Sequence, residues 1–321
     1  MAAVLEVSDL KTTFSTPEGE VKAVSGVGFA INRGETLGVV GESGSGKSQI
    51  FMSIMGLLAR NGRAAGSVKF HGQEILNLPV EKLNQVRGAK MSMIFQDPMT
   101  SLNPYLSVRK QMTEVLVQHK GMTEAQAAQQ AIDLLERVQI PSAKQRLNLY
   151  PHEFSGGMRQ RVMIAMSLLC GPELLIADEP TTALDVTVQA QILELLVELQ
   201  RDVGMAVALI THDLGVIARA ADRVMVMYAG NIVEAGAVRD LFKGPQHPYT
   251  QGLLESMPRL NETEATRLQT IGGQPPNLQN LPSGCAFRDR CRYAFERCVT
   301  ERPMLAEFAA GRSKACHLPH L

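Results

Sequence analysis

The sequence predicts an α/β protein with a largely parallel β-sheet, followed by a smaller C-terminal region of different character. Short apolar runs alternate with helical stretches through most of the chain, and that alternation is typical of a parallel sheet with helices on its faces. A glycine-rich loop follows one of the apolar runs, and four of the five cysteines gather near the C-terminus. These three observations indicate a phosphate-binding α/β domain with a cysteine-containing extension.

The first 60 residues predict strands and then a strand–loop–helix unit. Residues 4–7 and 21–31 alternate roughly at period two, with Pro17-Glu18-Gly19 as the turn between them, so we expect an antiparallel pair. Residues 36–40 form a short apolar run between glycines, as expected of a buried strand, and residues 48–58 predict the helix that follows it.

The middle of the chain contains further buried strands and a helical region. We expect helices over about residues 98–170, including one over 124–138 with Thr123 as its N-cap. Short apolar runs that read as buried strands cover residues 91–95, 174–177, 206–210 and 224–227.

Composition and charge limit the class of protein. Of the 321 residues, Lys and Arg number 32 and Asp and Glu number 32. This balance disfavours a protein whose partner is nucleic acid, because phosphate contacts usually need a basic surface. The first ten residues have no basic region and include the acidic residues Glu6 and Asp9. We therefore expect no secretory signal there. No apolar run approaches the roughly 18 residues of a membrane span, so any membrane role should act through partners.

The glycine-rich loop predicts a phosphate site. Gly41-Glu42-Ser43-Gly44-Ser45-Gly46-Lys47-Ser48 matches the pattern G-x-x-x-x-G-K-[ST]. In this pattern the backbone wraps a phosphate chain, and the following helix directs its positive end at the same group. We expect Lys47 to reach the β- and γ-phosphates and Ser48 to hold Mg²⁺.

A pair of carboxylates ends a predicted strand. The run Leu174-Leu175-Ile176-Ala177 leads directly into Asp178 and Glu179, and ligands of such sheets bind at the carboxyl ends of the strands. We expect Asp178 to hold Mg²⁺, directly or through water, and Glu179 to accept a proton from an attacking water. The loop and the carboxylates together predict hydrolysis of a nucleoside triphosphate.

Five further features occur in the order shown by ATP-binding cassette (ABC) ATPases. Phe154-Ser155-Gly156-Gly157-Met158-Arg159-Gln160 resembles the signature motif of that family. Gln96 resembles its Q-loop glutamine, His212 its switch histidine, and Ala183-Leu184-Asp185 its D-loop, while Phe14 stands in the place of the aromatic that stacks on adenine. From about residue 4 to residue 240 the chain is therefore identified as a member of the ABC ATPases.

The resemblance implies a P-loop NTPase fold with a RecA-like core, an antiparallel β subdomain and a helical signature subdomain. It also implies that ATP and Mg²⁺ bind and that two cassettes pair head to tail, with each signature acting on the γ-phosphate held by the other cassette. Glu179, His212 and Gln96 are expected to act in hydrolysis, and Ser48, Gln96 and Asp178 to hold Mg²⁺. The expected nucleotide contacts are Phe14, Gly41, Ser43, Gly44, Ser45, Gly46, Lys47, Ser48, Gln96, Ser155, Gly156, Gly157, Asp178 and Asp185.

The region after Gly244 narrows the resemblance. The segments His247-Pro248-Tyr249-Thr250, Pro275-Pro276-Asn277-Leu278 and Leu281-Pro282-Ser283-Gly284-Cys285 resemble the C-terminal part of the D-type ATPase subunits of bacterial oligopeptide and dipeptide importers. Phe154 and Met158 in the signature, where the broad family has Leu and Gln, also resemble that branch. We therefore expect a cassette over residues 1–243 and an importer-type extension over 244–321.

The resemblance to this branch implies the partners and the location of the chain. The expected partners are a second ATPase subunit, two transmembrane permease subunits and, indirectly, an external peptide-binding protein, with the chain peripheral on the cytoplasmic face of the bacterial inner membrane. Other cargoes remain open: a nickel chelate, a murein peptide or a glycoside. A soluble ABC ATPase that acts on ribosomes or DNA is the rival from another class, and such proteins usually carry two cassettes in one chain.

Cys285, Cys291, Cys298 and Cys316 have five, six and seventeen residues between them. Disulfides are disfavoured because ATP hydrolysis places the chain in the reducing cytosol. A zinc site remains possible, although the usual C-x₂₋₄-C spacing is missing. A [4Fe–4S] cluster takes four thiolates, and the resemblance favours it because this branch carries a cluster on these cysteines. Four unligated thiols are the remaining alternative.

Overall fold

The computed structural model describes residues 3–96, 101–181, 185–257 and 271–321, with only the backbone of Val186. The predicted D-loop residues Ala183 and Leu184 lie outside the described residues, as does the predicted start of the helical region at residues 98–100. The chain divides into two compact units. Unit 1 contains residues 1–4, 32–34 and 78–208, and unit 2 contains residues 5–31, 35–77 and 209–321.

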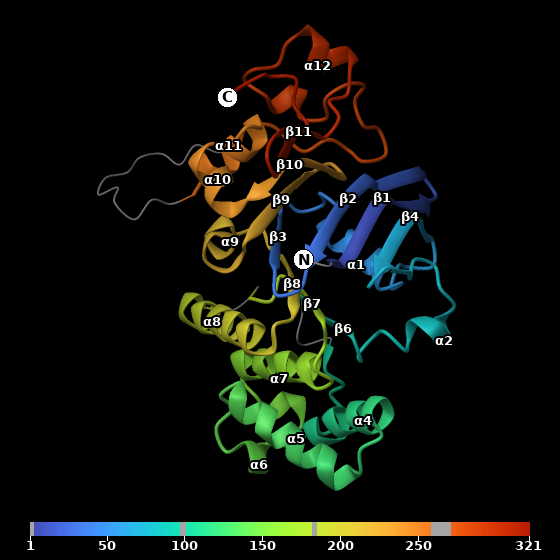
Figure 1. Cartoon of the computed structure of the whole chain (residues 1–321), viewed down its shortest axis with the longest axis vertical. Helices are drawn as coiled ribbons and strands as arrows, with labels where there is room; N and C mark the ends of the chain where they lie inside the picture. The colour runs from blue at the N-terminus through green and yellow to red at the C-terminus, as the bar shows by residue number, and fades with distance from the viewer. Residues whose placement is uncertain (1–2, 97–100, 182–184, 258–270) are drawn as a thin grey trace, which may run out of the picture. The chain divides into compact units, whose positions relative to one another are not determined.

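An antiparallel sheet occupies the N-terminal part of unit 2 (Figure 1). Its order is β2-β1-β4-β5, with β1 at Ala3–Thr16, β2 at Gly19–Asn32, β4 at Gly62–Phe70 and β5 at Gln73–Glu74. Leu5 pairs with Phe70 at one end of the β1–β4 ladder, and Phe14 pairs with Gly62 at the other. The predicted strands are confirmed, and each is longer than its apolar alternation indicated. The sequence analysis missed β4, whose first six residues are half-buried or exposed and show no apolar alternation.

A second set of strands in unit 2 has the order β11-β12-β10-β9-β3. Strand β3 (Thr36–Val40) runs parallel to β9 (Arg223–Tyr228), and β10 (Asn231–Ala237) runs antiparallel to β9. The predicted strands over 36–40 and 224–227 are thereby confirmed. A Cβ atom on Gly38 would lie 2.7 Å from Cδ1 of Ile217, so β3 packs closely against α9 (Leu214–Ala220).

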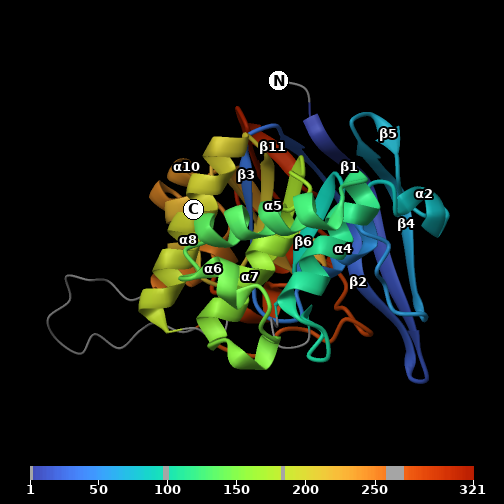
Figure 2. The same ribbon diagram turned by 90° about the horizontal axis from the view of Figure 1, so that it is seen from below.

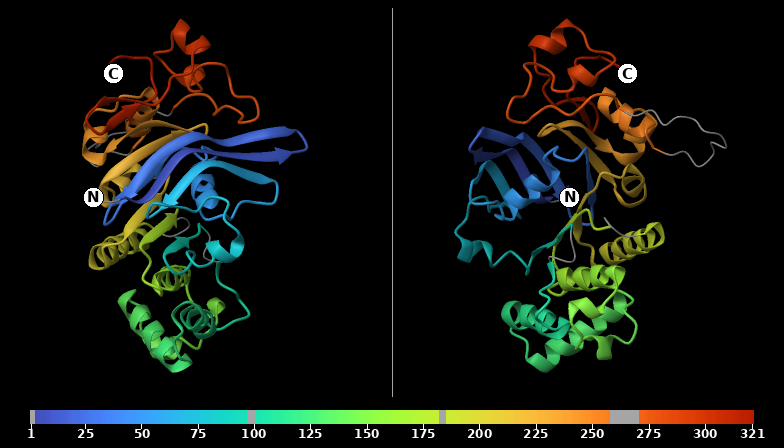
Figure 3. Two further views of the ribbon diagram at one scale, coloured as in Figure 1. Left: turned by 45° about the vertical axis from the view of Figure 1, so that its right-hand side comes forward. Right: turned by 180° about the vertical axis from the view of Figure 1, so that it is seen from behind.

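The C-terminal residues extend this sheet. Strand β12 (Arg312–Lys314) pairs antiparallel with β10, and β11 (Ala306–Ala309) pairs with β12. From two sides, Figure 3 shows the red C-terminal segment against the yellow and orange elements of this unit. Where unit 2 is described, its remaining helices are α1 (Lys47–Ile54), α10 (Val238–Lys243), α11 (Pro248–Glu255), α12 (Glu296–Thr300) and the 3₁₀ turn η2 (Arg288–Arg290).

Unit 1 combines parallel strands with a group of helices. Strand β6 (Met91–Ile94) runs parallel to β7 (Leu174–Asp178), with Met91 opposite Leu174, and all nine residues are buried. The division between the units falls within β8 (Ala206–Ile210). Figure 2 shows α4, α5, α6 and α7 as one group. The helices that the described residues of this unit form are α2 (Val80–Leu83), α4 (Val108–Lys120), α5 (Glu124–Arg137), α6 (Ala143–Arg146), η1 (Pro151–Glu153), α7 (Gly156–Leu168) and α8 (Val186–Val203).

Two helix ends illustrate the local signals. Thr123 caps α5, and Gln126 completes a capping box, which confirms the predicted start. By contrast, the helix predicted over 48–58 ends at Ile54. Gly56 adopts a φ of 59° two residues later, and a left-handed glycine ends a helix. Within the described residues, no helix has the length and apolarity needed to cross a membrane.

Candidate functional site

The phosphate loop lies in unit 2 between β3 and α1, as predicted. Close backbone approaches hold it in place. A Cβ atom on Gly41 would lie 2.2 Å from the carbonyl oxygen of Met227, and one on Gly46, whose φ is 97°, would lie 2.2 Å from that of Ala23. Only glycine fits at either position, so the loop's path depends on both.

The polar groups of the loop suit a bound phosphate chain. The Lys47 side chain is buried, and its Nζ donates to the carbonyl oxygens of Gly41 at 2.7 Å and Glu42 at 3.0 Å. The hydroxyl of Ser45 is buried without a hydrogen-bond partner in the described part of the chain. Around Gly44, a Cβ atom would meet nothing within 4 Å. An orphaned donor, a buried ammonium group and open space at a helix N-terminus together fit a phosphate.

His212 belongs to the same unit as the loop. The backbone N–H of Thr211 donates to the carbonyl oxygen of Val39 at 3.1 Å, so the chain leaves β8 beside the end of β3. The His212 side chain is exposed, and Asp213 caps α9 directly after it by accepting from Gly215 N at 2.7 Å. The switch role predicted for His212 stays a prediction.

Phe14 is half-buried on β1. A Cβ atom on its cross-strand partner Gly62 would lie 2.7 Å from Cε1 of the ring. Gly62 therefore makes room for the ring on this face of the antiparallel sheet. Stacking of Phe14 on adenine remains a prediction.

Two predicted catalytic residues meet in unit 1. The side-chain amide of Gln96, two residues after β6, donates from Nε2 to Oε2 of Glu179 at 3.0 Å. Glu179 follows Asp178, which is buried at the end of β7. The backbone φ of Glu179 is 46°. Such a positive value is uncommon for a residue with a side chain, and residues that adopt it cluster at functional sites. The contact orients the carboxylate that the sequence analysis assigned as the base.

The signature residues form the N-terminus of α7. Ser155 is the N-cap, and its Oγ accepts from Met158 N at 3.4 Å. The space around Gly156 is open, since a Cβ atom there would meet nothing within 4 Å, whereas one on Gly157 would lie 3.0 Å from Cγ1 of Val188. Exposed Ser155 therefore stands at an open helix N-terminus, which suits an anion.

Two buried polar residues, the last residue of the signature and the one that follows it, support that helix. Arg161 is buried and donates to the carbonyl oxygen of Val138 at 2.9 Å and to Oε1 of Gln191 at 2.9 Å. Gln160 is buried and donates to the carbonyl oxygen of Pro180 at 2.5 Å. The sequence analysis missed both contacts, because nothing local distinguishes these residues from exposed polar side chains on a helix.

Asp185 has a clear local role. It is the N-cap of α8, and its Oδ1 accepts from the backbone N–H of Val188 at 3.0 Å. This geometry is that of an ordinary helix cap. The contact with nucleotide that the resemblance implies for Asp185 stays a prediction.

The four C-terminal cysteines line one pocket of unit 2. Burial, together with smaller contributions from the nearby Cys298 and Cys316, raises the pKa of the Cys285 thiol to about 11. Burial also raises the pKa of Cys291 and of Cys316. The four cysteines therefore share a pocket, but no three His, Cys, Asp or Glu side chains of the described residues are arranged to hold a metal ion.

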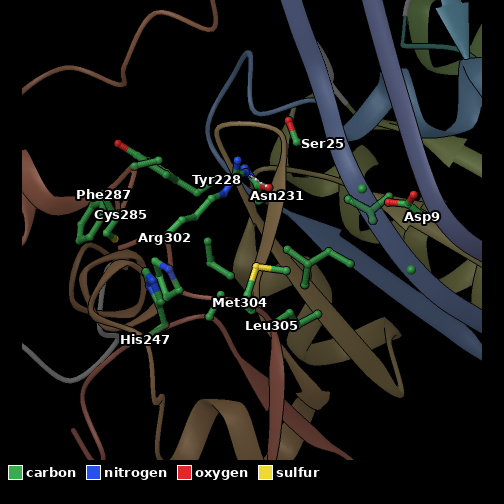
Figure 4. Close-up of a pocket in the computed structure, with 18 of the residues that line it drawn as sticks. Asp9, Ser25, Tyr228, Asn231, His247, Cys285, Phe287, Arg302, Met304 and Leu305 are labelled. Atoms are coloured by element: carbon green, nitrogen blue, oxygen red, sulfur yellow. Dashed lines mark hydrogen bonds between the residues drawn. The ribbon is translucent and has the colours of Figure 1, made fainter. Parts of the chain in front are cut away.

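A larger pocket adjoins residues 285–316, which carry the four cysteines and are called the cysteine segment below (Figure 4). Cys285, Phe287 and His247 lie together on one side of it, and Asp9 of β1 lies on the other. Arg302 donates to Oδ1 of Asn231 across its interior. The pocket thus joins the C-terminal residues to β1 and β2 within the same unit.

Comparison with known proteins decides the family. A family model described as ABC transporter matches residues 24–182, and one described as oligopeptide/dipeptide transporter, C-terminal region, matches residues 233–298. The oligopeptide transport ATP-binding protein OppD of Salmonella typhimurium is 58% identical over 316 residues, covering 98% of this chain and 94% of that one. The chain belongs to the oligopeptide transport ATP-binding proteins of the ABC transporter family.

Other oligopeptide transport ATP-binding proteins are similar to the chain over nearly its whole length. OppD of Haemophilus influenzae is 54% identical, covering 99% of this chain and 98% of that one, and AppD of Bacillus subtilis is 50% identical, covering 99% and 97%. Among solved structures, a dimeric ATP-binding cassette with bound ADP and Pi superposes with a TM-score of 0.66 at 26% identity, covering 73% of this chain and 99% of that one. The predicted fold class and the prediction of an ABC ATPase are confirmed.

Proposed function

We propose that the chain is the ATP-hydrolysing subunit that powers import of oligopeptides or dipeptides through an ABC permease. The observation that carries the cargo class is the match of residues 233–298 to the C-terminal region of oligopeptide and dipeptide transporters. Near-complete coverage of relatives named for oligopeptide transport supports it. A nickel chelate, a murein peptide and a glycoside are the alternative cargoes to which a negative result of the test below would direct the search.

The residues divide the work of hydrolysis. The phosphate loop, with Lys47 and the orphaned Ser45 hydroxyl, would bind the β- and γ-phosphates, and Ser48, Asp178 and Gln96 would hold the magnesium ion. Bound Mg²⁺ neutralises charge on the phosphates. Glu179 accepts the proton of the attacking water, whose oxygen bonds to the γ-phosphorus as the bond to the ADP oxygen breaks. The Gln96 amide keeps the Glu179 carboxylate oriented.

The signature points to a second ATPase subunit. Ser155 and the backbone N–H groups at the start of α7 present an open anion-binding end. We assign it to the γ-phosphate of ATP held by a partner cassette, with Phe14 and His212 contacting nucleotide in the chain's own loop. The dimeric state of a structural relative supports this assignment.

A surface of unit 1 suits a permease. Pro104, Tyr105, Leu149, Tyr150 and His152 line an open pocket beside α4 and η1. Tyr105 is 87% exposed, and the rings of Tyr150 and His152 stack with centroids 5.8 Å apart. Exposed aromatic groups of this kind mark interaction sites. We assign this surface to a short helix of the permease, which places the chain on the cytoplasmic face of the bacterial inner membrane.

The four cysteines are proposed to bind a [4Fe–4S] cluster, with Zn²⁺ as the alternative. Their shared pocket supports a common ligand, and a bound cation would favour the thiolates that burial disfavours. We expect protein purified without oxygen to be brown and to contain about four irons per chain. Metal analysis and the visible spectrum check this. Stoichiometric zinc without iron would replace the cluster by a zinc site, and metal-free protein would leave four unligated thiols.

Peptide uptake tests the proposed function. In a strain without other peptide importers, we expect cells with Glu179→Gln to lose nearly all uptake of a labelled oligopeptide, because general-base catalysis contributes about 10²- to 10⁴-fold. Glu198→Gln, on an exposed position of α8, is the matched control and should import at the wild-type rate. Uptake that is absent from both wild-type and Glu179→Gln cells would refute the peptide cargo and direct the search to the other solutes, whereas full uptake by Glu179→Gln cells would refute Glu179 as the general base.

A further inference from the structure

The second residue of the phosphate loop is held by the C-terminal extension. Arg290 donates from Nη1 to Oε2 of Glu42 at 2.8 Å and from Nη2 to Oε1 at 2.9 Å, a bidentate ion pair between residues 248 positions apart. The Arg290 side chain is 5% exposed and that of Glu42 is 27% exposed. Two-point geometry makes the pair directional, and removal of Glu42 would leave the buried charge of Arg290 without its counterion.

The backbone of Glu42 is held as well. Its N–H donates to the hydroxyl oxygen of Tyr249, on α11, at 2.9 Å. Its carbonyl oxygen accepts from Lys47 Nζ at 3.0 Å and from Ser45 N at 3.2 Å. The extension therefore holds the side chain and the N–H of Glu42, while the carbonyl of the same residue contacts the phosphate-binding lysine.

The extension positions Arg290 and Tyr249 rigidly. Arg290 also donates to the carbonyl oxygen of Gly272 at 3.0 Å, and its guanidinium lies 5.8 Å from the ring centre of Tyr228 and 5.9 Å from that of Phe287. The ring of fully buried Tyr249 packs 4.7 Å from that of Tyr228. Each group is held from several sides, so the loop is anchored to a preformed support.

Arg290 itself belongs to the cysteine segment. It ends η2, directly before Cys291, and the following N–H of Cys291 donates to the carbonyl oxygen of Arg288. This turn fixes the backbone of Arg290 directly beside Cys291. Within unit 2, a short chain of contacts runs from Arg290 of the cysteine segment through Glu42 to Lys47.

We propose that Arg290 and Tyr249 are positioning residues for nucleotide binding, through which the C-terminal extension preorganises the phosphate loop. Without them, Glu42 and the turn around it gain freedom that must be lost again when nucleotide binds, and affinity falls accordingly. This inference rests on the proposed nucleotide site in residues 41–48. Neither residue touches the nucleotide; both act through Glu42.

The test measures ADP affinity of the full chain by calorimetry. We expect Arg290→Gln to weaken ADP binding about five- to thirtyfold and Tyr249→Phe, which removes only the hydroxyl, about two- to fivefold. Arg292→Gln is the matched control, because Arg292 neighbours Cys291 but pairs with Glu255 and is half-exposed. It should bind ADP within about twofold of the wild type.

Steady-state kinetics and a double-mutant cycle separate positioning from stability. A positioning role raises KM for ATP while kcat is retained, whereas partial unfolding would lower kcat at constant KM. Glu42→Gln combined with Arg290→Gln should bind ADP no more weakly than the worse single variant. Arg290→Lys should recover part of the affinity, because it restores one of the two hydrogen bonds.

Unchanged ADP affinity in folded Arg290→Gln and Tyr249→Phe overturns the inference. If Arg290→Gln fails to fold, Tyr249→Phe decides alone, since the ring and its packing are kept. Lys47→Ala separates this failure from that of the underlying site. If Lys47→Ala binds ADP as the wild type does, the proposed nucleotide site is wrong; if it alone loses binding, only the positioning role is wrong.

Discussion

His247 shows how a single residue depends on its burial. It is 1% exposed and is the N-cap of α11, with Nδ1 accepting from Tyr249 N at 3.1 Å. The backbone N–H of His247 donates to Oε2 of Glu234 at 3.0 Å. Burial, together with the charge of Lys314, lowers the pKa of His247 to about 3. The imidazole is therefore neutral at physiological pH, and its cap can accept a hydrogen bond.

This burial predicts a pH dependence of stability. Between the folded pKa of about 3 and the ordinary value of 6.5, only the unfolded chain binds the proton, so stability is full above pH 6.5 and falls as the pH drops toward 3. The slope from His247 should be about 1.4 kcal/mol per pH unit between roughly pH 6 and 4. Urea unfolding at several pH values measures it.

His247→Asn provides the comparison, because an asparagine side chain can still accept at an N-cap. Its free energy of unfolding should change less steeply between pH 6 and 4 than that of the wild type. Exposed His152→Asn should keep the wild-type slope. Identical slopes for wild type and His247→Asn would show that His247 is not kept neutral by the fold.

At the scale of single elements, α5 shows how local signals act together with packing. Ala127, Ala131 and Leu135 are fully buried at helical spacing along it, and the capping box of Thr123 and Gln126 starts it. The sequence analysis predicted this helix and its cap, because both signals lie within a few residues of the helix start. The short strand β12 carries no such signal, and its pairing with β10 and β11 makes it a strand.

Removal of the cap should cost stability at this element. We expect Thr123→Ala to lower the free energy of unfolding by about 1 kcal/mol, because the backbone N–H of Gln126 loses the Thr123 hydroxyl that accepts its hydrogen bond. Thr123→Ser keeps the hydroxyl and should stay within a few tenths of the wild-type value, about 0.3 kcal/mol. Chemical denaturation of the three proteins measures the differences, and an unchanged Thr123→Ala would rule out the cap as a source of stability.

At the scale of the whole molecule, the compact units do not follow the order of the chain. Each unit is built from three separate segments, and residues 244–321 belong to the same unit as the phosphate loop. The predicted boundary between a cassette over 1–243 and an extension over 244–321 stays a prediction. Within unit 2, the extension adds β12 to the sheet, and its residues Arg290 and Tyr249 contact Glu42 of the phosphate loop. The extension therefore supports a loop that is distant from it in the chain.

The sequence by itself determined the local features of this protein: the glycine-rich loop and its lysine between β3 and α1, the carboxylates at the end of β7, the buried strands and the cap of α5. Each of these depends on residues close together in the chain, where spacing and residue type limit the possible structures. Only the tertiary structure decided which distant residues meet. Gln96 reaches Glu179 across 83 residues, and Arg290 reaches Glu42 across 248. Such contacts depend on the folded path of the whole chain, which no local periodicity encodes.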